Sequence, residues 1–137
     1  MKVIPIYIEA GISGFESPAA EYKELGLSLE KLLIQHPNAT FFGVANGHSM
    51  QGVGIFDGDI LVVDRAAKRK KTAIIVANYN GCFVCKIFDE KKALLLSASN
   101  KHKPIQVSAS DEFTIEGVVN ISFRLHGISP RLLSCLA

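Results

Sequence analysis

The chain has 137 residues, a formal net charge of +2 and a hydrophobic fraction of 48%, which fits one folded domain with a substantial core. Its longest apolar runs, residues 60–63 and 73–77, are far shorter than the roughly 20 residues of a membrane-spanning helix. The first ten residues also make a poor signal peptide, so we expect a cytoplasmic protein without a transmembrane segment. The small net charge does not indicate nucleic-acid binding, and the basic run 68–71 is interpreted as a solvated loop.

The three cysteines predict reduced thiols, because no secretion signal accompanies them. Cys82 and Cys85 form a C-x-x-C pair within an apolar segment rich in strand-forming residues. Residues three apart on a strand point to opposite faces, and the sequence contains no second Cys or His pair at ligand spacing. We therefore expect neither a metal site nor a cofactor.

In chain order, the first expected element is an arm over residues 1–27, which we predict to be flexible because it lacks periodicity and holds several prolines and glycines. Ser28 can then cap a short helix with Leu29, Leu32 and Leu33 on one face. Pro37 ends that helix, because a proline disfavours helical geometry at the preceding residue.

From residue 40 onward the sequence is typical of a mainly β, mostly antiparallel domain, since short runs of β-branched and aromatic residues alternate with Gly, Asn and Asp. The expected strands cover residues 41–45, 60–64, 72–79, 82–88, 93–97 and 113–123. Asn80-Gly81 predicts a tight hairpin because both residues tolerate positive φ. We expect the β-rich domain to span residues 28–126 and assign no role to the extension 127–137.

Two side chains are candidates for chemistry. Ser49 lies in a segment without helix or strand period, where a serine can be exposed and reactive, although most loop serines are only solvated. Lys86 interrupts an apolar run and, by alternation, shares a strand face with Val84 and Phe88. If that face is buried, desolvation lowers the pKa of the lysine and provides a neutral amine as a base. If the sheet is one-sided, Lys86 faces solvent.

The segment Gly47-His48-Ser49-Met50 is followed by Gly52 and by Asp57-Gly58-Asp59 before the apolar run 60–64. This stretch resembles the nucleophile region of the UmuD/LexA family of self-cleaving serine peptidases, peptidase S24. Phe83-Val84-Cys85-Lys86 is similar to its lysine strand, and residues 17–22 and 32–37 are similar to its UmuD branch. The likeness covers about residues 13–124.

The resemblance implies a compact LexA/UmuD-like peptidase domain in which Lys86 is the general base for the nucleophile Ser49. Backbone N–H groups of Ser49 and Met50 would form the oxyanion hole. The implied substrate is the protein's own arm, cut between Ser13 and Gly14. The family usually has Ala or Cys before the cut, so Ser13 predicts slow cleavage.

The UmuD branch further implies a homodimer, cleavage promoted by RecA filaments on single-stranded DNA, and association with a UmuC-like Y-family polymerase in SOS translesion synthesis. The twelve residues before Ser13 are too few for the helix-turn-helix domain of a LexA or phage repressor, so direct sequence-specific DNA binding is not expected. Alternatives are a catalytically silent UmuD-like regulatory module, a fragment of a repressor, and a signal-peptidase relative, which would need a membrane anchor.

Overall fold

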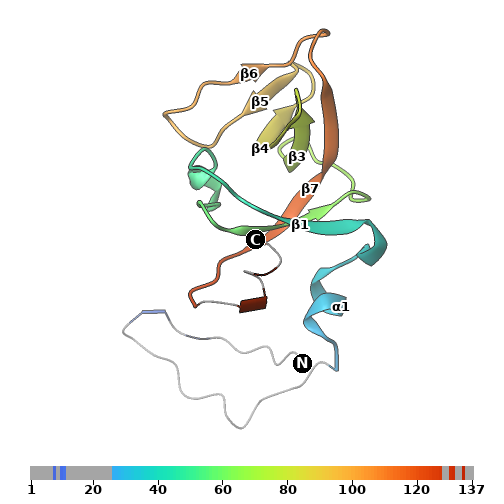
Figure 1. Cartoon of the computed structure of the whole chain (residues 1–137), viewed down its shortest axis with the longest axis vertical. Coiled ribbons are helices and arrows are strands. Elements are labelled where there is room, and N and C mark those ends of the chain that lie inside the picture. The colour runs from blue at the N-terminus through green and yellow to red at the C-terminus, as the bar shows by residue number, and fades with distance from the viewer. Residues whose placement is uncertain (1–7, 9, 12–25, 128–129, 132–133, 135–137) are drawn as a thin grey trace. The chain divides into compact units, whose positions relative to one another are not determined.

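The computed structural model describes residues 8, 10–11, 26–127, 130–131 and 134. The chain divides into two compact units, Met1–Pro37 and Asn38–Ala137, and each is considered by itself. In chain order (Figure 1) the elements are α1 (Leu29–Leu33), η1 (Pro37–Ala39), β1 (Thr40–Val44), η2 (Gln51–Val53), β2 (Ile60–Asp64), β3 (Ile74–Tyr79), β4 (Cys82–Asp89), β5 (Leu94–Leu96), β6 (Ile105–Gln106) and β7 (Phe113–Phe123).

The short helix α1 in the first unit begins where the sequence predicts it, after Ser28, and ends at Leu33, earlier than the predicted stop at Pro37. The side chain of Ser28 accepts a hydrogen bond of 3.2 Å from the backbone N–H of Lys31, which satisfies one of the free donors at the helix start. The three leucines of α1 remain between 40% and 44% exposed. None of the helices in the described residues is long and apolar enough to cross a membrane.

The second unit contains an antiparallel seven-stranded sheet with the strand order β1-β2-β7-β3-β4-β5-β6. The predicted mainly β fold class is therefore confirmed. β7 is the long central strand, and it pairs with β3 through its first half and with β2 through its second half. Figure 1 shows β7 running from the β3–β6 part of the sheet to the level of β1.

The predicted strands agree with the structure in position and closely in length. β2 and β7 have the predicted bounds, and β1, β3, β4 and β5 differ by one or two residues at their ends. The hairpin is confirmed: Asn80 and Gly81 have φ values of 51° and 86°, and Tyr79 lies opposite Cys82. β6 was not predicted, because two residues are too few to show a period of two.

Gly117 in β7 allows the neighbouring strand β2 to approach β7 closely. Two register shifts interrupt the pairing of β7, one opposite Val62/Val63 and one opposite Val76/Ala77. A Cβ atom on Gly117 would lie 2.7 Å from Cγ1 of Val63 and 2.9 Å from the carbonyl oxygen of Asp64. Only glycine fits this approach, and bulges of this kind bend a strand and increase its twist.

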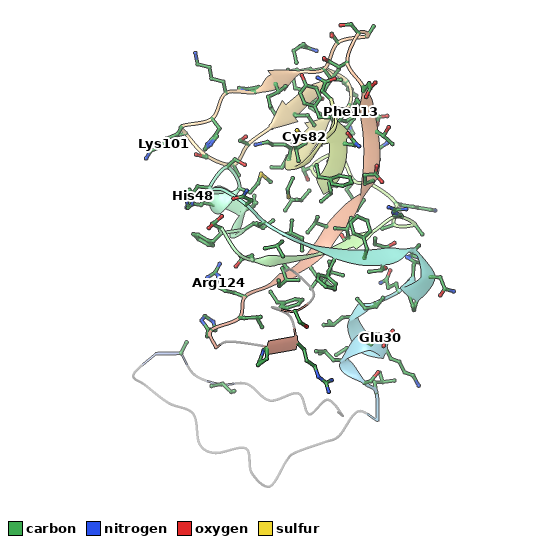
Figure 2. The ribbon with its side chains drawn as sticks, in the orientation of Figure 1. Glu30, His48, Cys82, Lys101, Phe113 and Arg124 are labelled. Atoms are coloured by element: carbon green, nitrogen blue, oxygen red, sulfur yellow. The ribbon has the colours of Figure 1, made fainter. Side chains whose placement is uncertain are left out.

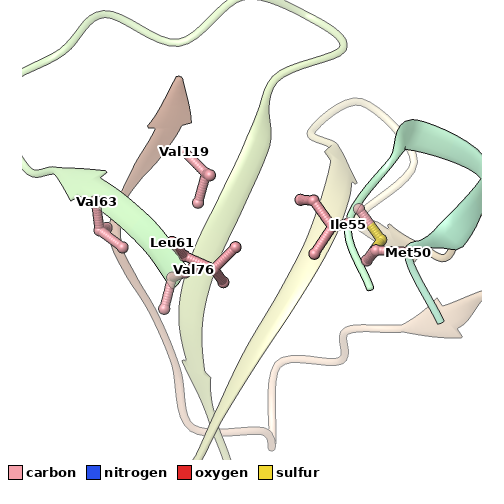
Figure 3. Packing of buried hydrophobic residues seen from close by; sticks show 6 residues of the cluster. All are labelled: Met50, Ile55, Leu61, Val63, Val76 and Val119. Atoms are coloured by element: carbon pink, nitrogen blue, oxygen red, sulfur yellow. The ribbon is translucent and has the colours of Figure 1, made fainter. Parts of the chain in front are cut away.

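The bent sheet packs around two hydrophobic clusters. Figure 3 shows the side chains of the first cluster, which are Met50, Ile55, Leu61, Val63, Val76 and Val119. The second cluster is built on Ile75, Ala77 and Leu95. β4 contributes to both, because Cys85 and Ile87 pack against the first cluster while Val84 and Phe88 pack against the second. Lys86 thus lies on a strand with packed neighbours on both faces.

Candidate active site

The loop between β1 and β2, residues 45–59, carries Ser49 and is closed at its base by backbone hydrogen bonds. The Ala45 N–H donates to the carbonyl of Asp59, and the Gly58 N–H donates to the carbonyl of Ala45, each at 2.8 Å. Within the loop, the Gly47 N–H donates to Oδ1 of Asp57 at 2.7 Å. Gly47 and Gly58 have φ values of 106° and 86°, which favour glycine. The loop conformation is therefore specified by its own sequence.

The middle of the same loop is anchored in the core. Met50 and Ile55 are only 3% and 4% exposed, and the Ile55 N–H donates to the carbonyl of Met50 at 3.2 Å. The Gly52 N–H donates at 2.7 Å to the carbonyl of Ala98, which lies beyond β5. Burial of Met50 fixes the chain next to Ser49, because adjacent residues share one peptide plane.

Ser49 is half-buried between exposed His48 and buried Met50. Figure 2 labels His48 on this loop, and its Nδ1 lies 3.0 Å from Nε2 of Gln51. Among the described residues, neither the Ser49 nor the Met50 backbone N–H donates a hydrogen bond. Two adjacent backbone donors beside a serine hydroxyl can bind an oxyanion.

Lys86 lies in the middle of β4 with its Cα opposite that of Ile75. The side chain is half-buried, and desolvation lowers its pKa, while the neighbouring Cys85 has a smaller effect in the opposite direction. Nζ of Lys86 donates a hydrogen bond of 2.8 Å to Oγ of Ser97. A lysine with a lowered pKa can act as a proton acceptor.

One pocket of about 340 Å³ brings the two candidate residues together, because Ser49 and Lys86 both line it. The other walls come from β1, from the Ser49 loop and from neighbouring strands, including Gly43, Val44, Met50, Leu61 and Val84. Within the described part of the chain, no hydrogen bond joins Ser49 to Lys86. The predicted cleavage site, Ser13-Gly14, lies outside the described residues.

Two further parts of this site did not emerge from the sequence. Ser97 belongs to no recognisable sequence motif, and its contact with Lys86 depends on strand register.

Asp59 is 2% exposed and accepts hydrogen bonds from Nε and Nη2 of Arg124 at 2.7 and 3.0 Å, and from the Phe56 N–H at 2.8 Å. The hydrogen bond from Arg124, labelled in Figure 2, lowers the pKa of Asp59. This pair ties the loop base to the residue after β7.

The C-x-x-C cysteines differ in their surroundings. Cys82 is exposed and Cys85 is partly buried, and both are free thiols. Burial raises the pKa of Cys85 to about 11, partly offset by the charge of Lys86. Across the described residues, no three His, Cys, Asp or Glu side chains gather as metal ligands.

Comparison with known proteins shows the family to which the chain belongs. Residues 3–120 match the family described as Peptidase S24-like, and the chain belongs to this family. It is similar to Protein MucA of Salmonella typhimurium, with 35% identity over 130 residues that cover 93% of this chain and 89% of that protein. Protein ImpA of Salmonella typhimurium is 43% identical over 111 residues, 81% of this chain and 71% of ImpA.

A more distant similarity links the chain to a repressor. The LexA repressor of Alteromonas mediterranea is 34% identical over 103 residues, which are 73% of this chain and 49% of that protein. The resemblance to the UmuD/LexA family that the sequence predicted is thus confirmed.

Proposed function

We propose that this chain is a UmuD-like self-cleaving serine peptidase, with Ser49 as the nucleophile and Lys86 as the general base. The observation that carries the proposal is that both residues line the same pocket. Partial burial of Lys86 lowers its pKa and so enlarges the fraction of neutral amine near neutral pH. Membership of a peptidase family supports the assignment of the serine as nucleophile and the lysine as base.

In the proposed reaction, Oγ of Ser49 attacks the carbonyl carbon of Ser13 while Nζ of Lys86 takes the hydroxyl proton. The N–H groups of Ser49 and Met50 stabilise the resulting oxyanion. When the C–N bond to Gly14 breaks, Lys86 returns the proton to the departing amine. A water molecule, deprotonated by Lys86, then attacks the ester carbonyl, and Lys86 returns the proton to Oγ of Ser49 as the ester C–O bond breaks and residues 1–13 leave with a new C-terminal carboxyl group.

The proposed substrate is the chain's own arm, cut between Ser13 and Gly14. β1 supports this choice, because it is an edge strand of the sheet and its residues Gly43 and Val44 line the pocket. An extended peptide can add to such an edge through main-chain hydrogen bonds. A glycine after the scissile bond leaves the carbonyl accessible to the nucleophile, since it has no side chain.

We further propose that the processed chain acts in the cytoplasm as a homodimer and as an accessory subunit of a UmuC-like error-prone polymerase in the SOS response. A RecA filament on single-stranded DNA would promote the cut by binding preferentially to the state with the arm in the pocket. Family membership and the similarity to MucA and ImpA over most of the chain support this role.

The direct test is incubation of the purified full chain from neutral to strongly alkaline pH, with and without RecA, ATP and single-stranded DNA, followed by mass spectrometry. We expect a fragment that begins at Gly14, and its loss in Ser49→Ala and Lys86→Ala. Lys92→Ala, which removes an exposed turn lysine, is the matched control and should cleave like the wild type.

Persistence of the intact chain under every condition would contradict the peptidase. The same fragment from Ser49→Ala would show that a contaminating protease makes the cut. The second candidate function, a catalytically silent regulatory module, is favoured by the hydrogen bond of Lys86 to Ser97 in place of Ser49. A silent module would bind its polymerase partner equally well as wild type and as Ser49→Ala, with no fragment formed.

A further inference from the structure

We propose that Ser97 is a positioning residue for Lys86, and that Ser97 and Ala98 together set the position of both members of the proposed dyad. The inference rests on the proposed peptidase function and assigns a role to a segment that contains neither catalytic group. Two hydrogen bonds carry it, one to each of these adjacent residues: Lys86 donates to the hydroxyl of Ser97, and the Gly52 N–H donates to the carbonyl of Ala98.

The first contact follows from the pairing of β4 with β5. Ile87 lies opposite Leu96 in this antiparallel pair, so the next residue past the end of β5, Ser97, lies opposite Lys86. Directly opposed residues of an antiparallel pair present their side chains on the same face, within reach of each other. The observed distance of 2.8 Å between Nζ and Oγ is that of a good hydrogen bond.

This contact restricts a side chain that would otherwise have several free torsions. Lysine carries about 2 kcal/mol of rotamer entropy, and its amine rotates freely in water. A neutral amine has two N–H bonds and one lone pair. With one N–H donated to Ser97, the lone pair of Lys86 is held in a narrow range of directions inside the pocket that Ser49 also lines.

The second contact docks the Ser49 loop on the same segment. The Gly52 N–H donates to the carbonyl of Ala98 at 2.7 Å, and a Cβ atom on Gly52 would lie 2.6 Å from that oxygen. Ala98 also packs against the cluster that contains Met50. Only glycine allows the loop to come this close, so the sequence requires Gly52 for docking and not for turn geometry.

Consecutive residues are joined by a rigid peptide plane, so a displacement of this segment moves both contacts together. The position of the base relative to the nucleophile therefore depends on this one short segment. Rates of reaction between positioned groups fall about 100-fold for a misplacement of about 1 Å. Ser97 therefore acts on the rate through Lys86, without touching the scissile bond.

The hydroxyl of Ser97 also affects the charged form of the base. After Lys86 takes the proton, its ammonium group still donates to Ser97, and a hydrogen bond to the charged form favours that form. Removal of the hydroxyl should therefore lower the pKa of Lys86 and shift the midpoint of cleavage to lower pH, while misplacement of the amine lowers the plateau rate at high pH.

The experiment compares the self-cleavage rate of the full chain across pH in wild type, Ser97→Ala, Ser97→Thr and Ser99→Ala. We expect the plateau cleavage rate of Ser97→Ala to be about one tenth of the wild-type rate or lower, and the midpoint of its pH dependence to lie at lower pH. Ser97→Thr keeps the hydroxyl and should restore both values. Ser99 is the matched control, because its hydroxyl accepts from the backbone N–H of Lys101 and lies 3.0 Å from Nδ1 of His102, and neither contact involves Lys86.

NMR titration of the lysine side chains provides a readout that does not need cleavage. The Lys86 midpoint should be lower in Ser97→Ala than in wild type. A wild-type rate and midpoint in Ser97→Ala would overturn the inference, as would a slower rate with an unmoved Lys86 titration, since that indicates only a folding defect. Absence of cleavage in wild type would refute the proposed function, and the titration alone would then decide the Ser97 contact.

Discussion

The loop that carries Ser49 and the strand that carries Lys86 are held in place by different means. The loop depends on specific contacts within and around it, including the Gly47 N–H to Asp57 and the burial of Met50. Lys86 depends on the register of β4, which is fixed by pairing with β3 over residues 82–87 and with β5 over residues 87–89. Single substitutions should therefore disturb the serine more easily than the lysine.

The two regions also differ in how they affect stability. The Ser49 loop contributes apolar side chains to the core, so its structure and its proposed function favour the same conformation. Lys86 is a partly desolvated amine between packed neighbours, and desolvation of a charge opposes folding. Three substitutions test this difference, from the largest expected effect to the smallest.

Met50→Ala should have the largest effect, because it empties a buried position in the first cluster. We expect a loss of about 3 kcal/mol in the free energy of unfolding, typical of a large-to-small core substitution. Chemical denaturation measures this loss. Phe83→Ala, at a position that is 70% exposed, is the control and should change stability by less than about 0.5 kcal/mol. Equal losses in the two variants would contradict an anchored loop.

Gly52→Ala should have an intermediate effect. Its Cβ would collide with the carbonyl of Ala98 and break the backbone hydrogen bond there. We expect a loss of about 2 kcal/mol in the free energy of unfolding, together with strongly reduced self-cleavage. Gly43→Ala is the matched stability control, because no atom lies within 4 Å of its added Cβ. A Gly52→Ala variant as stable and active as wild type would show that the docking contact is dispensable.

Lys86→Met should have the smallest effect on stability while removing the proposed base. We expect the free energy of unfolding of Lys86→Met at neutral pH to exceed that of wild type by up to about 0.5 kcal/mol. The gain is small because partial exposure to solvent screens the charge of Lys86. Because the folded-state pKa of Lys86 is lowered, wild type gains stability as pH rises from the folded toward the unfolded value. The advantage of Lys86→Met should therefore shrink in alkali, and an advantage independent of pH would contradict this explanation.

Much of the fold could be predicted because its signals are local. Asn80-Gly81 specifies a hairpin within two residues, and Ser28 caps α1 through a residue three positions away. The same local pattern placed Lys86 on β4. Whether its environment lowers the pKa depended on the strands and loops around it, which alternation alone does not give.

The contacts that complete the candidate site are not local. Ser97 meets Lys86 only through the register of β4 and β5, and Gly52 meets Ala98 across 46 positions of sequence. The role of Gly52 was hidden for the same reason, because a glycine required for close approach looks the same in sequence as one required for a turn. Non-local packing therefore decides how the pocket is assembled.

The central claim is that Lys86 is the base for Ser49, and the pH dependence of self-cleavage tests it most directly. The rate should rise with pH and level off, with a midpoint below the ordinary lysine value of about 10.4, because desolvation lowers the pKa of Lys86. Lys86→Ala should show no such rise. A rate that does not vary with pH, or an identical profile in Lys86→Ala, would contradict the claim.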